Sequence, residues 1–147
     1  MLAREGPITI ERTHSGGCYA KRTEANEILQ GILRDLDQTK TDLVVSSANG
    51  TFIDQAELNA LEHGIPDAIV YTGKPAIGES VGASALWQVI FGAQALRKKE
   101  LPPVLHADGA ISLKLSRSRM PLTEARHAII LASGVNQQIA ALRLAVA

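Results

Sequence analysis

The sequence has a single cysteine, Cys18, so it can form no internal disulfide bond, and this favours a reducing cytoplasmic setting. Its four histidines are scattered without the spacing of zinc ligands, so we expect no metal site. Acidic and basic residues balance at 15 each. Without an excess of positive charge, we expect neither nucleic acid nor an anionic membrane surface as a partner.

Long apolar runs are lacking as well. The first residues, 1–7, have no hydrophobic stretch of the kind that a secretory signal carries. The longest uncharged run, Ser80–Leu96, is interrupted by serine, glutamine and glycine. It is shorter than the roughly 20 apolar residues that a membrane span needs. We therefore predict that this run forms a largely buried helix inside a single domain.

The pattern along the first half of the chain alternates strands and helices. Apolar and polar residues alternate in Pro7–Arg12, which predicts a half-buried strand that is interrupted at Ser15–Gly17. Thr23 is a plausible N-cap of a following helix. The apolar residues of that helix fall on one face: Ile28, Leu29, Ile32, Leu33 and Leu36. Leu43–Val45 and Ala68–Tyr71 predict buried strands.

Two further helices are expected. Asp54 and Glu57 have the spacing of a capping box at the start of a short helix. After Glu79 a long apolar helix is expected to end at Arg97–Lys99, where positive charge suits the negative end of the helix dipole.

The last part of the chain predicts strands. Ile111–Leu115 alternates, and Ala128–Leu131 and Ile139–Leu142 predict a strand pair around the turn Ser133–Asn136. The order of elements indicates an α/β fold, with helices packed on a mixed sheet.

Two short segments have the spacing of a known motif. Lys74 is followed by Gly78-Glu79 and then by Gly82-Ala83-Ser84, and Asn49-Gly50-Thr51 follows a predicted strand. Together they resemble the thiolase-fold β-ketoacyl synthases, which carry histidines at the positions of Asn49 and Glu79. The resemblance runs from about Pro7 to Ala147. It implies that residues 1–147 form the C-terminal half of a thiolase-like layered fold, whose N-terminal half would supply the nucleophilic cysteine.

The resemblance gives Asn49 and Glu79 the positions of catalytic groups but not their chemistry. In the family the two histidines donate hydrogen bonds to a developing enolate oxygen. Asn49 retains an N–H donor, but the residues themselves favour a simple turn at Asn49-Gly50. An ionised Glu79 at about 4 Å from an enolate would cost about 4 kcal/mol at an effective dielectric of about 20, or about a thousandfold in rate. The alternative role of Glu79 is to stabilise the N-terminus of the next helix.

Other positions match the family as well. Lys74 and Glu57 match a lysine and a glutamate that pair to brace the site, although from the residues alone they could be a loop charge and a capping residue. Ser133, Gly134 and Asn136 resemble a late glycine-rich turn, usually Phe-Gly-Gly-Thr-Asn, and are candidate substrate-binding residues. Cys18 lies outside the nucleophile motif, and we expect it to be buried and inert.

The resemblance implies a ketosynthase-like subunit or fragment in fatty-acid or polyketide chain elongation. We expect no condensing activity from this chain alone, and a role in shaping the acyl pocket of a partner, as chain-length factors do. Two alternatives stay open: the C-terminal part of an active β-ketoacyl synthase, and an unrelated small α/β binding module. The implied partners are an N-terminal ketosynthase half or partner ketosynthase, in a dimer, and an acyl carrier protein. No cofactor is expected.

Overall fold

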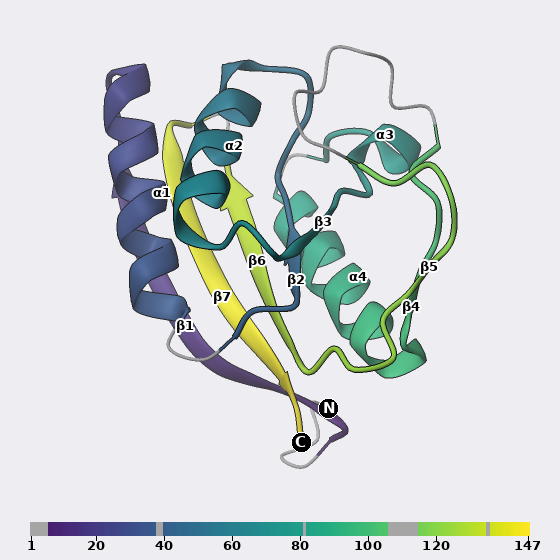
Figure 1. The fold of residues 1–147 in the computed structure, drawn as a ribbon. Helices are drawn as coiled ribbons and strands as arrows, with labels where there is room; N and C mark the ends of the chain where they lie inside the picture. Colours follow the sequence, from purple (N-terminus) through teal and green to yellow (C-terminus); the bar gives the residue numbers. More distant parts are fainter. Residues whose placement is uncertain (1–5, 38–39, 81, 106–114, 135) are drawn as a thin grey trace.

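The computed structural model describes residues 6–37, 40–80, 82–105, 115–134 and 136–147. Its main feature is a five-stranded mixed sheet in the order β1-β7-β6-β2-β3 (Figure 1). The strands are β1 (Ile8–Cys18), β2 (Leu43–Val45), β3 (Ile69–Tyr71), β6 (His127–Ser133) and β7 (Gln138–Val146). β2 is parallel to β3 and β6, whereas β7 is antiparallel to β1 and β6. A separate two-stranded sheet pairs β4 (Glu100–Leu101) with β5 (Met120–Pro121).

Helices cover both faces of the main sheet. α1 (Arg22–Leu36) and α2 (Phe52–Gly64) lie on one face, α4 (Ser84–Lys98) lies on the other, and the short α3 (Lys74–Ile77) precedes α4 (Figure 1). Alternate residues of β2 point to opposite faces, because side chains alternate along a strand. Val44 packs with α1 and α2, whereas Leu43 and Val45 pack with α4. The predicted α/β fold with helices on a mixed sheet is confirmed.

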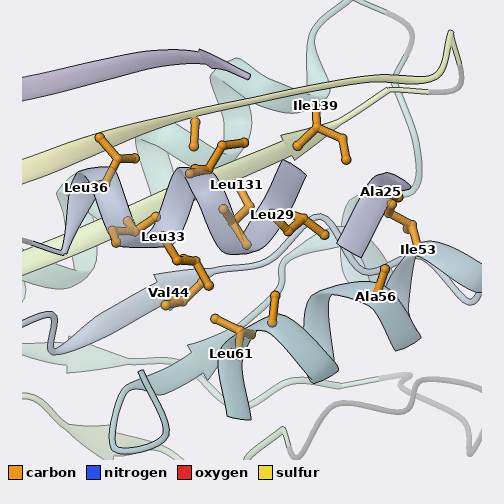
Figure 2. Close-up of a cluster of buried hydrophobic side chains, with 14 of the residues drawn as sticks. Ala25, Leu29, Leu33, Leu36, Val44, Ile53, Ala56, Leu61, Leu131 and Ile139 are labelled. Carbon is orange, nitrogen blue, oxygen red and sulfur yellow. The ribbon is translucent and has the colours of Figure 1, made fainter. Parts of the chain in front are cut away.

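The larger core lies between the sheet, α1 and α2. Figure 2 shows Leu29 and Leu33 of α1 beside Val44 of the sheet, with Ala56 and Leu61 of α2 in the same cluster. The predicted apolar face of α1 is therefore confirmed. The predicted cap is not, because α1 begins at Arg22 with Lys21 at the N-cap. Glu24 accepts hydrogen bonds from the backbone N–H groups of Ala20 and Lys21, so this carboxylate defines the start of the helix.

The first strand is longer than predicted. β1 continues through Ser15–Gly17 to Cys18, and its pairing with β7 shifts register between His14 and Gly17. Gly16 has φ +60°, and a Cβ there would lie 1.9 Å from the carbonyl oxygen of Ile139. The glycines that predicted an end to the strand form a bulge within it.

The predicted capping box at Asp54 and Glu57 is wrong. α2 begins one turn earlier, with Thr51 at its N-cap, and both acidic residues are buried inside the helix. The Asp54 carboxylate accepts hydrogen bonds from the backbone N–H groups of Asn49 (3.0 Å) and Gly50 (2.9 Å). Asp54 thus fixes the loop before the helix. Glu57 takes no part in capping the helix, and its side chain is buried.

The prediction that the long helix is largely buried is also wrong for this chain. α4 begins at Ser84 and buries one face against the sheet, through Gln88, Gly92, Ala95 and Leu96. On its outer face Leu86 is 63% exposed, Trp87 44% and Ile90 38%. The basic end of α4 is as predicted, with Arg97 and Lys98 in its last turn.

The C-terminal strands follow the sequence pattern. β6 and β7 pair antiparallel, which confirms the predicted strand pair. Of the alternating segment Ile111–Leu115, residues 111–114 lie outside the described residues. Arg143 of β7 was not singled out from the sequence, yet its side chain is only 2% exposed. Its guanidinium donates to Glu11 Oε2 (2.8 Å), the Leu36 carbonyl (3.0 Å) and Thr41 Oγ1 (2.9 Å), so it ties β7 to β1 and to the end of α1.

Candidate functional site

The predicted site residues converge where the parallel strands end. Ser46 and Ser47 follow β2, Lys74 follows β3, and Ser133 ends β6. The carboxyl ends of parallel strands meet at one edge of a sheet, and the divergence of neighbouring connections there opens a crevice. In this chain the N-terminus of α4 borders the same edge, so the two motif segments are brought together.

Asn49 and Glu79 are in contact although they are 30 residues apart in the sequence. Asn49 Nδ2 donates to Glu79 Oε2 at 3.4 Å. The other end of the amide is fixed, because Asn49 Oδ1 accepts from the Thr51 backbone N–H (3.2 Å) and hydroxyl (2.7 Å). The donor retained at position 49 is therefore directed at the carboxylate at position 79.

Glu79 is also the ion-pair partner of Lys74. Lys74 Nζ lies 2.7 Å from Glu79 Oε2, and the Lys74 side chain is 5% exposed against 37% for Glu79. The Ser84 hydroxyl donates to the other carboxylate oxygen. Burial acts to raise the pKa of Glu79, but the contacts with Lys74, Ser84 and Asn49 outweigh it, so the pKa is lowered. Glu79 is thus held as a carboxylate.

The resemblance implied that Lys74 pairs with Glu57, but the direct contact of Lys74 in the structure is with Glu79. Glu57 is fully buried and accepts hydrogen bonds from the hydroxyls of Ser46 and Ser47, and from Ser133 Oγ at 3.4 Å. Burial raises the pKa of Glu57, the serine hydrogen bonds oppose this, nearby Asp54 adds to it, and the charge of Lys74 lowers it. Lys74 thus acts on Glu57 through its charge, while its ammonium group contacts Glu79.

A cavity of about 320 Å³ joins most of the predicted site residues. Its lining includes Lys74 and Glu79 together with Ser133, Gly134 and Asn136. Asn49 lines a neighbouring hollow of about 300 Å³ that shares Ser133 and Gly134 with the first. The late turn that was predicted to bind substrate therefore lies between the two hollows. Glu57 lines neither hollow but contacts this turn through Ser133.

Four residues of the site were not predicted. Ser46 and Ser47 bind Glu57, Ser84 binds Glu79, and Gln88 of α4 lines the cavity. Gln88 is 2% exposed, and it carried one signal that could have been used. It is a polar residue on the face of α4 that is otherwise made of small and apolar residues.

Cys18 is exposed, so the prediction that it is buried is wrong. It ends β1 opposite Gln138 and does not line the cavity. Within the described ranges, no three His, Cys, Asp or Glu side chains are grouped as a metal site would require. No helix in the described part of the chain is long and apolar enough to cross a membrane.

The sequence matches the family model for the C-terminal domain of β-ketoacyl synthases over residues 8–108. A search among curated proteins finds no match.

The chain is also similar to several solved structures. One is the oxazolomycin ketosynthase domain OzmH KS8 of Streptomyces albus JA3453, with a TM-score of 0.69 and 20% identity over 96% of this chain and 43% of that one. A second is the ishigamide ketosynthase/chain length factor, with a TM-score of 0.70 and 19% identity over 96% of this chain and 36% of that one. A third is the ketosynthase from module 1 of the bacillaene synthase of Bacillus amyloliquefaciens FZB42, with a TM-score of 0.71 and 14% identity over 96% and 29%. At these identities the likeness shows the thiolase-like fold, and the chain spans less than half the length of each structure.

Proposed function

Because the chain belongs to the β-ketoacyl synthase family, as a C-terminal domain, we propose that it is a ketosynthase-like subunit acting in fatty-acid or polyketide chain elongation. In this proposal the chain does not catalyse condensation by itself. It completes and shapes the acyl pocket of an N-terminal ketosynthase half or a partner ketosynthase in the cytoplasm. Family membership removes the alternative of an unrelated binding module.

The observation that carries the proposal is the contact among Asn49, Glu79 and Lys74. Decarboxylation of a malonyl thioester needs donors aimed at the developing enolate oxygen. Here the Asn49 amide donates to Glu79 instead, and the Lys74 ammonium is paired with the same carboxylate. The amide of Asn49, which is the donor that remains at the two histidine positions, and the ammonium of Lys74 are thus both engaged with the Glu79 carboxylate. An enolate would have to compete with a carboxylate for them.

The outer face of α4 supports a partner. Leu86, Trp87 and Ile90 are exposed side by side on a helix that carries no charge before Arg97. Soluble monomers rarely leave a large apolar patch open. The resemblance implies that a second α/β half packs against this one as further layers. Two similar structures are themselves described as assemblies: the ishigamide ketosynthase/chain length factor, and AntDE:AntF, an acyl-carrier protein with its ketosynthase. We infer the same two kinds of partner for this chain.

The second candidate function is that of an active β-ketoacyl synthase, in which this chain completes a site whose cysteine lies on the other half. The retained N–H donor of Asn49 favours it. The residue at the nucleophile position of the partner half decides between the two. A cysteine favours the active enzyme, and an inert residue such as glutamine favours the chain-length role.

The test is malonyl decarboxylation by the chain assembled with a cysteine-bearing N-terminal half. We compare the native chain with the double variant Asn49→His, Glu79→His at equal folded concentration. We expect little decarboxylation from the native assembly and a gain of at least about tenfold from the histidines. Asn59→His with Glu62→His, on α2 away from the cavity, is the matched control and should give no gain. A native assembly that condenses at ordinary ketosynthase rates would overturn the proposal.

A further inference from the structure

The ring of Phe91 fills the space that a side chain at position 73 would occupy. Phe91 lies on α4, and Gly73 directly precedes α3. A Cβ atom on Gly73 would lie 2.2 Å from Phe91 Cε2 and 2.7 Å from Phe91 Cζ, far inside van der Waals contact. Gly73 has φ −93° and ψ −8°, values that residues with side chains also adopt in turns. The contact with the ring, and not the backbone conformation, therefore requires glycine here.

Two aromatic neighbours hold the Phe91 ring in place. The Tyr71 ring meets it at an interplanar angle of 72° with 6.1 Å between the centroids. The Trp87 ring stacks on it at 30° and 6.2 Å. Aromatic pairs in these arrangements attract each other beyond the area that they bury. Tyr71 ends β3 and Trp87 lies one turn before Phe91 on α4, so the sheet and the helix both fix the ring.

The segment that packs against this ring carries Lys74. α3 has only four residues, and so short a helix is not stable through its own hydrogen bonds. The Gly73 carbonyl accepts from the backbone N–H groups of Ala76 (3.0 Å) and Ile77 (3.2 Å), so Gly73 is part of this turn. The Lys74 N–H donates to Thr72 Oγ1 at 3.3 Å, a long bond that constrains the turn weakly. The place of α3 therefore depends on what Gly73 packs against.

The place of α3 in turn decides where the Lys74 side chain begins. Lys74 Nζ lies 2.7 Å from Glu79 Oε2, and the Lys74 side chain is 5% exposed. A lysine side chain is flexible, and a buried ammonium needs its partner because water does not replace it. A displacement of Gly73 moves the backbone of Lys74 with it. The ion pair with Glu79 would then lengthen or break.

We propose that Phe91 is a positioning residue: its ring holds Gly73, and through Gly73 the backbone of Lys74, so that the Lys74 ammonium meets Glu79. Phe91 does not line the cavity and acts through Lys74, which does. The inference rests on the proposed function, because it takes the pair of Lys74 and Glu79 as part of the site. Trp87 stacks on the same ring and is 44% exposed, so the cavity and the outer face of α4 share one aromatic group.

The experiment titrates the Glu79 carboxyl by NMR in the full chain and in Gly73→Ala, Phe91→Leu and the double variant. Burial acts to raise the pKa of Glu79, and Lys74, Ser84 and Asn49 together outweigh it. In Gly73→Ala the added methyl group displaces Lys74, so the pKa of Glu79 should rise toward its ordinary value. Phe91→Leu removes the support and should raise the pKa too. In the double variant the methyl group takes the space that the ring leaves, which should reverse at least about half of the rise.

Leu96→Ala is the matched control. Leu96 is fully buried on the same helix, about 7.5 Å further along its axis from the N-terminus of α4 than Phe91. This variant should destabilise the chain and leave the titration of Glu79 unchanged. An equal change in Leu96→Ala would assign the effect to loss of packing in general and overturn the proposal. It would also be overturned by single variants that leave Glu79 unchanged, or by a double variant that shifts Glu79 as much as either single one.

The native chain supplies a test that needs no variant. Nuclear Overhauser effects between the Gly73 α-protons and the Phe91 ring protons should be strong, and their absence would overturn the proposal even where Gly73→Ala does not fold. These measurements use the chain alone, whereas association with a cysteine-bearing N-terminal half is measured separately by sizing. An assembly that forms while Glu79 does not respond removes the positioning role alone. A responding Glu79 in a chain that never associates removes the partner role alone.

Discussion

Double-mutant cycles can decide which carboxylate Lys74 pairs with. The resemblance to the family implies Glu57, whereas the structure puts Lys74 Nζ 2.7 Å from Glu79 Oε2. We would measure unfolding by urea for Lys74→Met, Glu79→Gln and the double variant, and repeat the cycle with Glu57→Gln. The coupling energy is the part of the double-variant effect that the single variants do not account for.

The expected magnitude follows from the geometry. Two unit charges 2.7 Å apart attract by about 6 kcal/mol at an effective dielectric of about 20. Desolvation of Lys74 offsets much of this, and Glu79 is 37% exposed, so solvent screens the pair. We therefore expect a coupling of about 1–2 kcal/mol between Lys74 and Glu79. Between Lys74 and Glu57 we expect less than about 1 kcal/mol, because Lys74 is the smallest of the influences on the pKa of Glu57.

A surface pair supplies the control. Arg119 and Glu100 lie 2.9 Å apart with side chains 70% and 39% exposed. Their coupling should be below about 0.5 kcal/mol and should fall further in 1 M salt, where the screening length is about 3 Å. The coupling energy between Lys74 and Glu79 should decrease by less in 1 M salt. A larger coupling of Lys74 with Glu57 than with Glu79, or one no larger than that of the surface pair, would refute the pairing described here.

Three further predictions concern stability and association. Burial raises the pKa of Glu57, so the stability that this residue contributes is complete below about pH 4.3 and is lost as the pH rises through the raised pKa. The variant Glu57→Gln should remove this pH dependence when thermal unfolding is measured. Trp87→Arg should weaken association with an N-terminal half at least about tenfold in sizing or binding assays, with little change in the stability of the chain itself, whereas Glu62→Arg should not. Gly73→Ala should cost about 1–3 kcal/mol in urea unfolding, because its Cβ would lie 2.2 Å from the Phe91 ring, whereas Gly31→Ala meets no atom within 4 Å and should be neutral or stabilising.

The sequence was sufficient for features that depend on local periodicity. The apolar face of α1, the strand β2 and the pair β6 and β7 each follow from residue spacing within one segment. The meeting of Asn49 with Glu79 was reached through the resemblance, which places both segments at one site. The first residue of a helix was harder to predict from the sequence. Thr23 has the residue type of a cap, but Glu24 accepts a hydrogen bond from the backbone N–H of Lys21, two residues before Thr23, and this fixes the start of the helix at Arg22.

The errors concern interactions between segments that are distant in sequence. Nothing near Gln88 indicates that its amide reaches Ser46 and Leu131, which lie 42 and 43 residues away. The uncharged run of α4 predicts burial, but it does not say whether both faces are covered within the same chain, and Trp87 is exposed here. Cys18 was expected inside because cysteine is usually buried, yet it stands at the end of an edge strand, where one side of the backbone has no neighbour in the sheet.

The partner of Lys74 also determines what a histidine at position 79 would do. Glu79→His removes the carboxylate that holds the Lys74 ammonium, while Glu57 already responds to the charge of Lys74. The lysine would then be free to turn toward Glu57, which would form the bracing pair of the family. A closer positive charge favours the ionised carboxyl, so the pKa of Glu57 should fall in this variant. The side-chain carboxyl signal of Glu57 can be titrated in the native chain and in Glu79→His, with Glu79→Gln to separate loss of charge from the imidazole. An unchanged titration of Glu57 in both variants would mean that Lys74 does not approach Glu57. The replacement of the family's histidine by Glu79 would then have no bearing on the bracing pair.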